Sequence, residues 1–121
     1  MYNHKHRYSY KYQRKSIGSC PESFIKSLLH KKSRRDTLLV KDVIDLYYNQ
    51  NGLCAISGVE MTHTTNEGKI DTNISIDKIE PNLGYTINNI QLVCHRVNIM
   101  KWDRDQNNLI FWCKKIIENN I

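Results

Sequence analysis

The stretch from Ser75 to Lys101, SIDKIEPNLGYTINNIQLVCHRVNIMK, holds the pattern that decides the fold. Its first residues belong to the alternating run NISIDKI, which predicts a β-strand with the acid Asp77 near its end. A loop that contains Pro81 and Gly84 follows, and IQLV is the returning strand. A helix is then expected from Cys94 onward. The stretch therefore predicts a strand–loop–strand–helix unit.

Two helices are predicted before this unit. SCPE, residues 19–22, fits a capping box with proline at the first helical position, and apolar residues follow at helical spacing over residues 24–29. The cationic run HKKSRR, residues 30–35, would close this helix near the negative end of its dipole. A second helix is predicted near residues 40–49, and Asn51-Gly52 would end it. We expect both helices to contribute to the core.

A further helix is predicted after the unit. Asp103 or Asp105 is expected to cap it, because an acid at this position accepts hydrogen bonds from the first backbone amides. Its expected buried side comprises Leu109, Ile110, Trp112, Cys113, Ile116 and Ile117. The whole pattern predicts a small α+β fold, with a two-stranded hairpin plus a helix at its centre and additional helices at both ends.

Length and composition favour one domain. The chain has 121 residues, of which 40% are hydrophobic, and this is enough for one modest core. We expect a basic, tyrosine-rich arm over residues 1–18 and a single domain over residues 19–121. No apolar run approaches the roughly 20 residues of a membrane span, and the polar N-terminus lacks a secretory pattern. A cytoplasmic protein with reduced cysteines is therefore expected.

Positive charge is concentrated toward the N-terminus. Residues 1–35 carry ten Lys or Arg against one acid, a net charge of +9, whereas residues 36–121 carry eight against eleven, a net charge of −3. Four tyrosines interleave with the first cations. A nucleic acid is the natural partner because binding its phosphates releases counterions, although such a charge run is often only a solvated tail. The residues expected to contact nucleic acid are Lys11, Arg14, Lys15, Lys31, Lys32, Arg34, Arg35 and Lys101.

The strand–loop–strand–helix unit resembles the ββα-metal motif of the HNH, or His-Me finger, endonucleases. The resemblance spans about residues 50–113 and is closer to a phage and restriction branch whose motif reads Asp-Arg in place of Asp-His. It implies a ββα-metal core. The elements that carry it, in chain order after the upstream segment CAISGVEM, are Asp77-Lys78, Gly84-Tyr85, Asn89, Leu92, Cys94, Val97-Asn98 and Lys101.

The resemblance implies a role for each matching position. Asp77 and Asn98 would bind one divalent cation, and Asn89 would hold the loop in shape. Oxygen ligands suit Mg²⁺, or another divalent cation such as Mn²⁺, because such ions bind through few protein groups and keep several waters. Without the resemblance, Asp77 would be interpreted as a turn cap, and the two asparagines as partners of backbone groups.

Lys78 stands where the usual family has its general-base histidine. A lysine is protonated at neutral pH and is a poor base, so Lys78 is interpreted as a phosphate clamp, like the arginine of the related branch. The base would then be His63, His95 or a metal-bound hydroxide. His95 lies three residues before Asn98, so the two would be neighbours on one helix. Tyr85 is a further candidate, for which a structural role is preferred.

A second departure concerns cysteine. Family members often carry two CxxC pairs that bind structural zinc, whereas the corresponding sites here read Cys54-Ala-Ile-Ser57 and Cys94-His-Arg-Val97. Each site lacks one thiolate, so no structural zinc is expected. Cys54 and Cys94 would instead be small buried side chains.

The resemblance implies a metal-dependent endonuclease, consistent with a phage-encoded one, that hydrolyses phosphodiester bonds in duplex DNA. A catalytically degenerate HNH-fold module that binds nucleic acid without cutting it stays open as an alternative. A basic RNA-binding or virion-associated protein that shares the fold is a third interpretation. Divalent-metal-dependent cleavage separates the first from the others.

Overall fold

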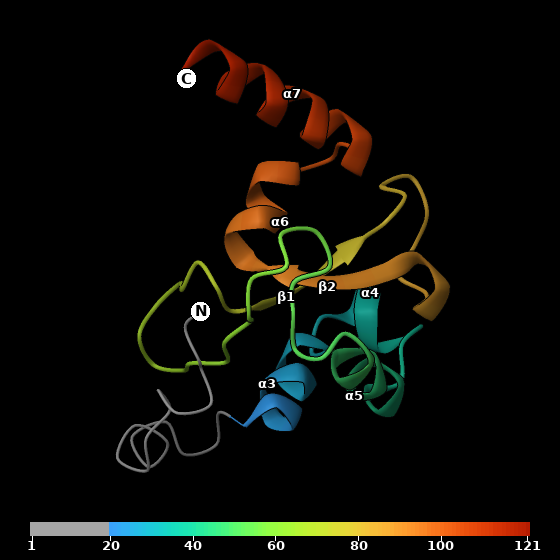
Figure 1. The fold of residues 1–121 in the computed structure, drawn as a ribbon. Coiled ribbons are helices and arrows are strands. Elements are labelled where there is room, and N and C mark those ends of the chain that lie inside the picture. The colour runs from blue at the N-terminus through green and yellow to red at the C-terminus, as the bar shows by residue number, and fades with distance from the viewer. Residues whose placement is uncertain (1–19) are drawn as a thin grey trace.

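The computed structural model describes residues 20–121, which form a small α+β fold, as predicted (Figure 1). The expectations for the arm, including Lys11, Arg14 and Lys15, lie outside the described residues. No helix in the described part is long and apolar enough to cross a membrane. The elements of this part are α3 (Pro21–Leu28), α4 (Lys32–Arg35), α5 (Val40–Asn49), β1 (Ile74–Lys78), the 3₁₀ turn η1 (Ile87–Asn89), β2 (Ile90–Cys94), α6 (His95–Lys101) and α7 (Gln106–Asn119).

β1 and β2 form an antiparallel pair whose register decides what each face carries. Ile76 lies opposite Leu92, and Asp77 lies opposite Gln91. Because side chains alternate along a strand, Ile76 faces one side and Ser75 and Asp77 face the other. Ile76 is buried in the apolar core, whereas Ser75 and Asp77 receive hydrogen bonds from α6. The alternation therefore presents the acid to the following helix.

The apolar core lies between the hairpin and the N-terminal helices. α3 and α5 pack on each other and on the strands, and α6 also packs on both strands. Figure 1 shows α3 and α5 on one side of the hairpin and α6 on the other. The buried core residues are Ile25, Leu29, Leu38, Val43, Cys54, Met61, Ile74, Ile76, Ile90, Leu92, Val93 and Cys94.

The N-terminal helices confirm the predicted pattern in outline, with two corrections. α5 covers the predicted residues, and α3 has Pro21 in its first turn. The cap of α3 is Cys20, not Ser19, and the Cys20 thiol accepts a hydrogen bond from the Ser23 amide at 3.4 Å. HKKSRR does not close α3, because the chain turns after Leu28 and most of the run forms the separate α4.

α7 has the predicted cap but not the predicted buried side. The Asp105 carboxylate accepts a hydrogen bond from the Asn108 amide at 2.8 Å, so Asp105 is the capping residue. Of the six residues expected to be buried, only Leu109 is. The reason is that α7 packs mainly on α6. It lies beyond α6, on the side away from α3 and α5, so the apolar core does not cover its apolar side (Figure 1). The exposed members of the expected side are Ile110, Trp112, Ile116 and Ile117.

Candidate functional site

A cavity of about 210 Å³ lies where β1, α4, the loop after β1 and the end of α6 meet. It brings together four residues singled out in the motif, Asp77, Lys78, Tyr85 and Asn98, with Arg34 from the cationic run. These residues are separated by up to 64 positions in the chain, from Arg34 to Asn98. The full lining comprises Arg34, Ile76, Asp77, Lys78, Pro81, Tyr85, Asn98, Trp102 and Asp103.

Asp77 is held by a buried ion pair. The Lys101 ammonium lies 3.0 Å from both carboxylate oxygens of Asp77 and donates a further hydrogen bond of 2.7 Å to the Lys78 carbonyl. The Gln91 amide, directly across the hairpin, donates to the same carboxylate at 3.0 Å. Asp77 is 3% exposed and Lys101 is 0% exposed. The carboxylate is thus fixed by charged and neutral donors together.

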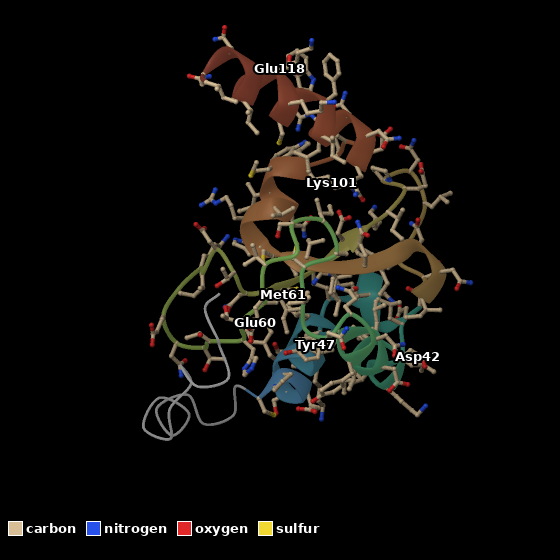
Figure 2. All side chains as sticks on the ribbon, in the orientation of Figure 1. Asp42, Tyr47, Glu60, Met61, Lys101 and Glu118 are labelled. Carbon is tan, nitrogen blue, oxygen red and sulfur yellow. The ribbon has the colours of Figure 1, made fainter. Side chains whose placement is uncertain are left out.

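The burial of Lys101 corrects one prediction. Lys101, labelled in Figure 2, was expected to contact nucleic acid, but it is buried and its ammonium hydrogen-bonds Asp77 and the Lys78 carbonyl of β1. Burying a lysine ammonium carries a desolvation cost, and the pairing with Asp77 and the hydrogen bond to the Lys78 carbonyl offset that cost. Its charge therefore acts on Asp77 and not on a bound phosphate backbone.

Asn98 ties α6 to β1. Its side-chain NH₂ group donates to the Ser75 hydroxyl at 2.5 Å and to the Ile76 carbonyl at 3.2 Å. Both donor positions of the amide are used in this way, so its carbonyl oxygen is the group left to accept a bond from a ligand. Helix and strand together therefore set the direction of one candidate ligand oxygen.

The oxygen atoms of Asp77 and Asn98 are the ligand type that a hard divalent cation prefers. Two hydrogen-bond donors occupy the Asp77 carboxylate, which has about four lone-pair sites, and Asn98 lines the same cavity. Within residues 20–121 no group of three or more His, Cys, Asp or Glu side chains could hold a metal. Water and a substrate phosphate would have to complete the coordination, as is usual for Mg²⁺. The Lys101 charge opposes cation binding at Asp77.

Asn89 makes the contacts that a loop clamp requires. Its side-chain oxygen accepts from the Glu80 amide at 3.0 Å, and its NH₂ group donates to the carbonyls of Glu80 at 3.2 Å and Gly84 at 2.9 Å. Its own carbonyl accepts from the Ile79 amide at 2.8 Å. Asn89 is buried, so these bonds hold the loop in a place where water does not compete.

Two cations lie close to the ring of Tyr85 in the cavity. The Lys78 ammonium and the Arg34 guanidinium each lie 5.2 Å from the ring centroid, which is within cation–π range. Arg34 also donates to the Leu28 carbonyl at 2.9 Å, and its Nε is buried with no hydrogen-bond partner among the described residues. Tyr85 thereby holds two positive charges at the cavity.

The other residues of the cationic run lie on the surface. Lys31, Lys32 and Arg35 are exposed and do not line the cavity. Lys32 pairs with Asp36 at 2.6 Å, a surface ion pair of the kind that contributes little to stability. These side chains are placed where a polyanion would reach them.

The two histidines predicted as bases lie away from the cavity lining. His63 acts electrostatically on Glu22, which belongs to α3, the helix on the opposite side of the hairpin from α6. His95 begins α6, and its Nε2 is buried with no hydrogen-bond partner in the described part of the chain. Neither imidazole is therefore among the groups that line the cavity with Asp77 and Asn98.

Cys54 and Cys94 are both buried and lie side by side. The Cys54 sulfur accepts hydrogen bonds of 3.3 Å from the amides of Ser57 and Cys94. The Cys94 thiol also donates to it, which lowers the pKa of Cys54 and raises the pKa of Cys94. Their burial agrees with the expected small core side chains, and the absence of structural zinc stays a prediction.

Three residues at or next to the cavity have contacts that the sequence analysis did not predict. Gln91 could have been found from the hairpin register, since it lies opposite Asp77. The roles of Lys101 and Trp102 depend on how α6 lies on the hairpin, which no local pattern reports. Comparisons of the chain with protein-family models, with curated proteins and with solved structures find no match, so its function has to be argued from the residues themselves.

Proposed function

We propose that this chain is a divalent-metal-dependent endonuclease that hydrolyses phosphodiester bonds in DNA. The observation that carries the proposal is the meeting of Asp77, Asn98, Lys78 and Arg34 in one cavity. Two of them offer oxygen ligands and two offer positive charge, which is the combination that phosphodiester cleavage requires. The order of residues in the hairpin and α6 resembles the HNH motif and supports the same assignment.

Each side chain has a role in this proposal. Asp77 and Asn98 would hold Mg²⁺ or a similar cation, which when bound polarises the scissile phosphate and stabilises the leaving oxygen. Lys78 and Arg34 would bind the phosphate oxygens, and both cations lie within cation–π range of the Tyr85 ring. Lys101 is a positioning residue, because it orients the Asp77 carboxylate from within the core.

The test has to allow for the buried ion pair. Asp77→Ala alone would leave the Lys101 charge buried and unpaired, at a cost of about 3–5 kcal/mol in stability. The double variant Asp77→Ala/Lys101→Met removes both charges and is expected to keep the fold. Asp45→Ala is the matched control, since Asp45 is an exposed acid on α5 that does not line the cavity.

Supercoiled plasmid is incubated with each purified protein, with Mg²⁺ or with a chelator. The wild type and Asp45→Ala should cut only when Mg²⁺ is present. The double variant should be folded by circular dichroism, should bind duplex DNA nearly as well, and should not cut. Cleavage by the folded double variant at the wild-type rate would show that the metal site is wrongly assigned.

A second function is favoured by a different observation. Asp77 is already neutralised by Lys101, and neither His63 nor His95 lines the cavity. A module that binds DNA without cutting it would have these features. DNA binding by the wild type without cleavage in either Mg²⁺ or Mn²⁺ would favour this function over the nuclease.

A further inference from the structure

Trp102 occupies a backbone position that tryptophan rarely adopts. It follows the last residue of α6 with φ 55° and ψ −122°. The Arg104 amide donates to the Lys101 carbonyl at 3.0 Å, which closes a four-residue turn over Trp102. These angles are those of the first central position of a type II′ turn, about +60° and −120°, where glycine and asparagine predominate. For a bulky side chain this conformation is strained.

Two other non-glycine residues in the described part have positive φ, and both are asparagines. Asn51 and Asn66 have φ values of 56° and 64°, which asparagine tolerates well. Trp102 differs from them in residue type. The strain at this turn therefore calls for a reason that the turn itself does not supply.

Packing within the chain does not supply the reason either. The Trp102 side chain is 72% exposed, so it gains little from burial. It lines the cavity that also holds Asp77, Lys78 and Asn98. A strained residue that is not compensated by core packing and that stands at a candidate site points to a ligand.

The surroundings of Trp102 identify the class of ligand. Lys78 and Arg34 in the same cavity suit a phosphate, and the large exposed indole beside them suits a flat aromatic group. A phosphate joined to a flat aromatic base is a nucleotide. Aromatic side chains beside a basic groove are how proteins hold unpaired nucleobases, since every base has a face on which to stack.

We propose that Trp102 stacks on an unpaired nucleobase next to the phosphodiester held at Asp77 and Lys78. The proposal rests on the nucleic-acid function argued above and narrows its substrate class. In an intact duplex the faces of each base are covered by its neighbours, so stacking on Trp102 requires a base that is single-stranded, terminal or extruded. Single-stranded or distorted DNA is then preferred over intact duplex.

The chain offers a direct optical test because it contains two tryptophans. The other, Trp112, lies on α7 and lines a different cavity. The full chain with Trp112→Phe reports Trp102 fluorescence alone. It is titrated in chelator with a short single strand and with a strand of equal length and charge that lacks its bases. Strong quenching is expected with the base-containing strand and little with the abasic one.

Three variants separate stacking from a structural role. Trp102→Ala should weaken binding to the base-containing strand roughly tenfold and leave binding to the abasic strand unchanged. Trp102→Phe should keep most of the affinity. Trp102→Gly should lose the affinity like alanine but raise the melting temperature by a few degrees, because glycine adopts this turn without strain. A tryptophan needed for folding would give a lower melting temperature in the glycine variant.

The outcomes distinguish this inference from the proposed function. Equal quenching by both strands, or equal affinity of wild type and Trp102→Ala for the base-containing strand, overturns the stacking role while leaving the nuclease proposal to the plasmid experiment. A wild-type chain that binds no nucleic acid overturns both. A lower melting temperature of Trp102→Gly assigns Trp102 to the fold and also counts against the inference.

Discussion

Lys78 is the residue at which the motif departs from its usual form, and its contacts favour one of the two roles proposed for it. Its ammonium lies against the Tyr85 ring, and its backbone carbonyl accepts the hydrogen bond of Lys101. Its side chain is partly exposed at the cavity. The positive charge of the ammonium is attracted to the face of the ring, which places it at the cavity. Binding a phosphate uses that charge, whereas proton abstraction would require its loss.

Substitution of Lys78 separates the two roles. Lys78→Arg should keep cleavage within about tenfold of the wild type, because a guanidinium also binds phosphate and stays charged. Lys78→Ala should lose about 100-fold or more, as transition-state charge then lacks a partner. Cleavage rates are measured at saturating Mg²⁺ over about pH 6 to 9.

Lys78→His completes the series, since it restores the usual family pair. If the surrounding space admits an imidazole, it should retain activity with a new dependence on pH near the ordinary histidine range. If Lys78 were the base, arginine could not replace it. A folded Lys78→Arg variant that binds DNA normally but is as inactive as Lys78→Ala would refute the clamp role.

At the scale of elements, the loop between β1 and β2 depends on one buried asparagine. Asn89→Ala removes three side-chain hydrogen bonds and leaves backbone groups of Glu80 and Gly84 without partners. The free energy of unfolding should fall by about 2–3 kcal/mol. Asn88→Ala is the matched control, because Asn88 is adjacent and exposed and should lose less than about 0.5 kcal/mol.

Urea unfolding of the two variants gives these values, and cleavage is measured on the same preparations. Pro81 and Tyr85 of this loop line the cavity, so Asn89→Ala should also reduce cleavage under conditions where it is still folded. Equal stability of the Asn88 and Asn89 variants would show that the loop is held by other contacts.

A hydrogen bond between side chains of α3 and α5 is also expected to depend on pH. The Tyr48 hydroxyl hydrogen-bonds the Glu22 carboxylate. This bond lowers the pKa of Glu22 and raises the pKa of Tyr48 from 10.0 to about 12. A lowered acid pKa gives stability that is present above the unfolded-state pKa and is lost as pH falls through the folded-state pKa. A raised tyrosine pKa gives stability that is present below 10.0 and is lost as pH rises through about 12.

Tyr48→Phe removes this bond and should lower the unfolding free energy at neutral pH by less than about 1 kcal/mol, since Tyr48 is exposed and Glu22 is partly exposed. The difference from wild type should shrink toward both acid and strongly alkaline pH. Urea unfolding across pH measures it. A difference that stays constant with pH would mean that the bond is not the source of the stability.

The elements also show what a sequence can predict and what it cannot. The bounds of α5 follow from its own residues, because an apolar stripe marks its length and Asn51-Gly52 adopts the positive φ that ends it. The hairpin follows from alternation in the same way. The predicted buried side of α7 is wrong, because periodicity shows which side of a helix is apolar but not whether another element covers that side.

The same limit applies within the candidate site. Asp77, Lys78 and Asn98 were predicted to act together, and they line one cavity because β1 pairs with β2, which continues directly into α6. Lys101 was misplaced because a lysine is normally exposed, and its acid partner lies 24 residues away. Pairing at that distance depends on how the helix packs, which local residue patterns do not encode.

At the scale of the molecule, most of the net positive charge lies in residues 1–19, whereas the residues of the candidate site lie in residues 20–121. Residues 1–19 carry five of the 18 Lys and Arg and no acid. Residues 20–121 carry the other 13 with all 12 acids, a net charge of +1. Arg34 and Lys78 place charge locally at the cavity, but the described body as a whole has almost none with which to attract DNA. In the proposed function, long-range attraction of DNA would therefore fall to the N-terminal residues.

Deleting residues 1–18 should accordingly weaken binding to all DNA sequences alike and leave the chemistry of the cavity intact. Each lost phosphate contact should flatten the log–log dependence of affinity on salt by about 0.9 for duplex DNA. Lys114→Gln/Lys115→Gln is the control, because it removes two charges from α7 and should leave the slope unchanged. Filter binding at several salt concentrations measures all three proteins. A deletion variant with the wild-type slope would show that the basic N-terminal residues do not contact DNA, and that Arg34 and Lys78 act without them.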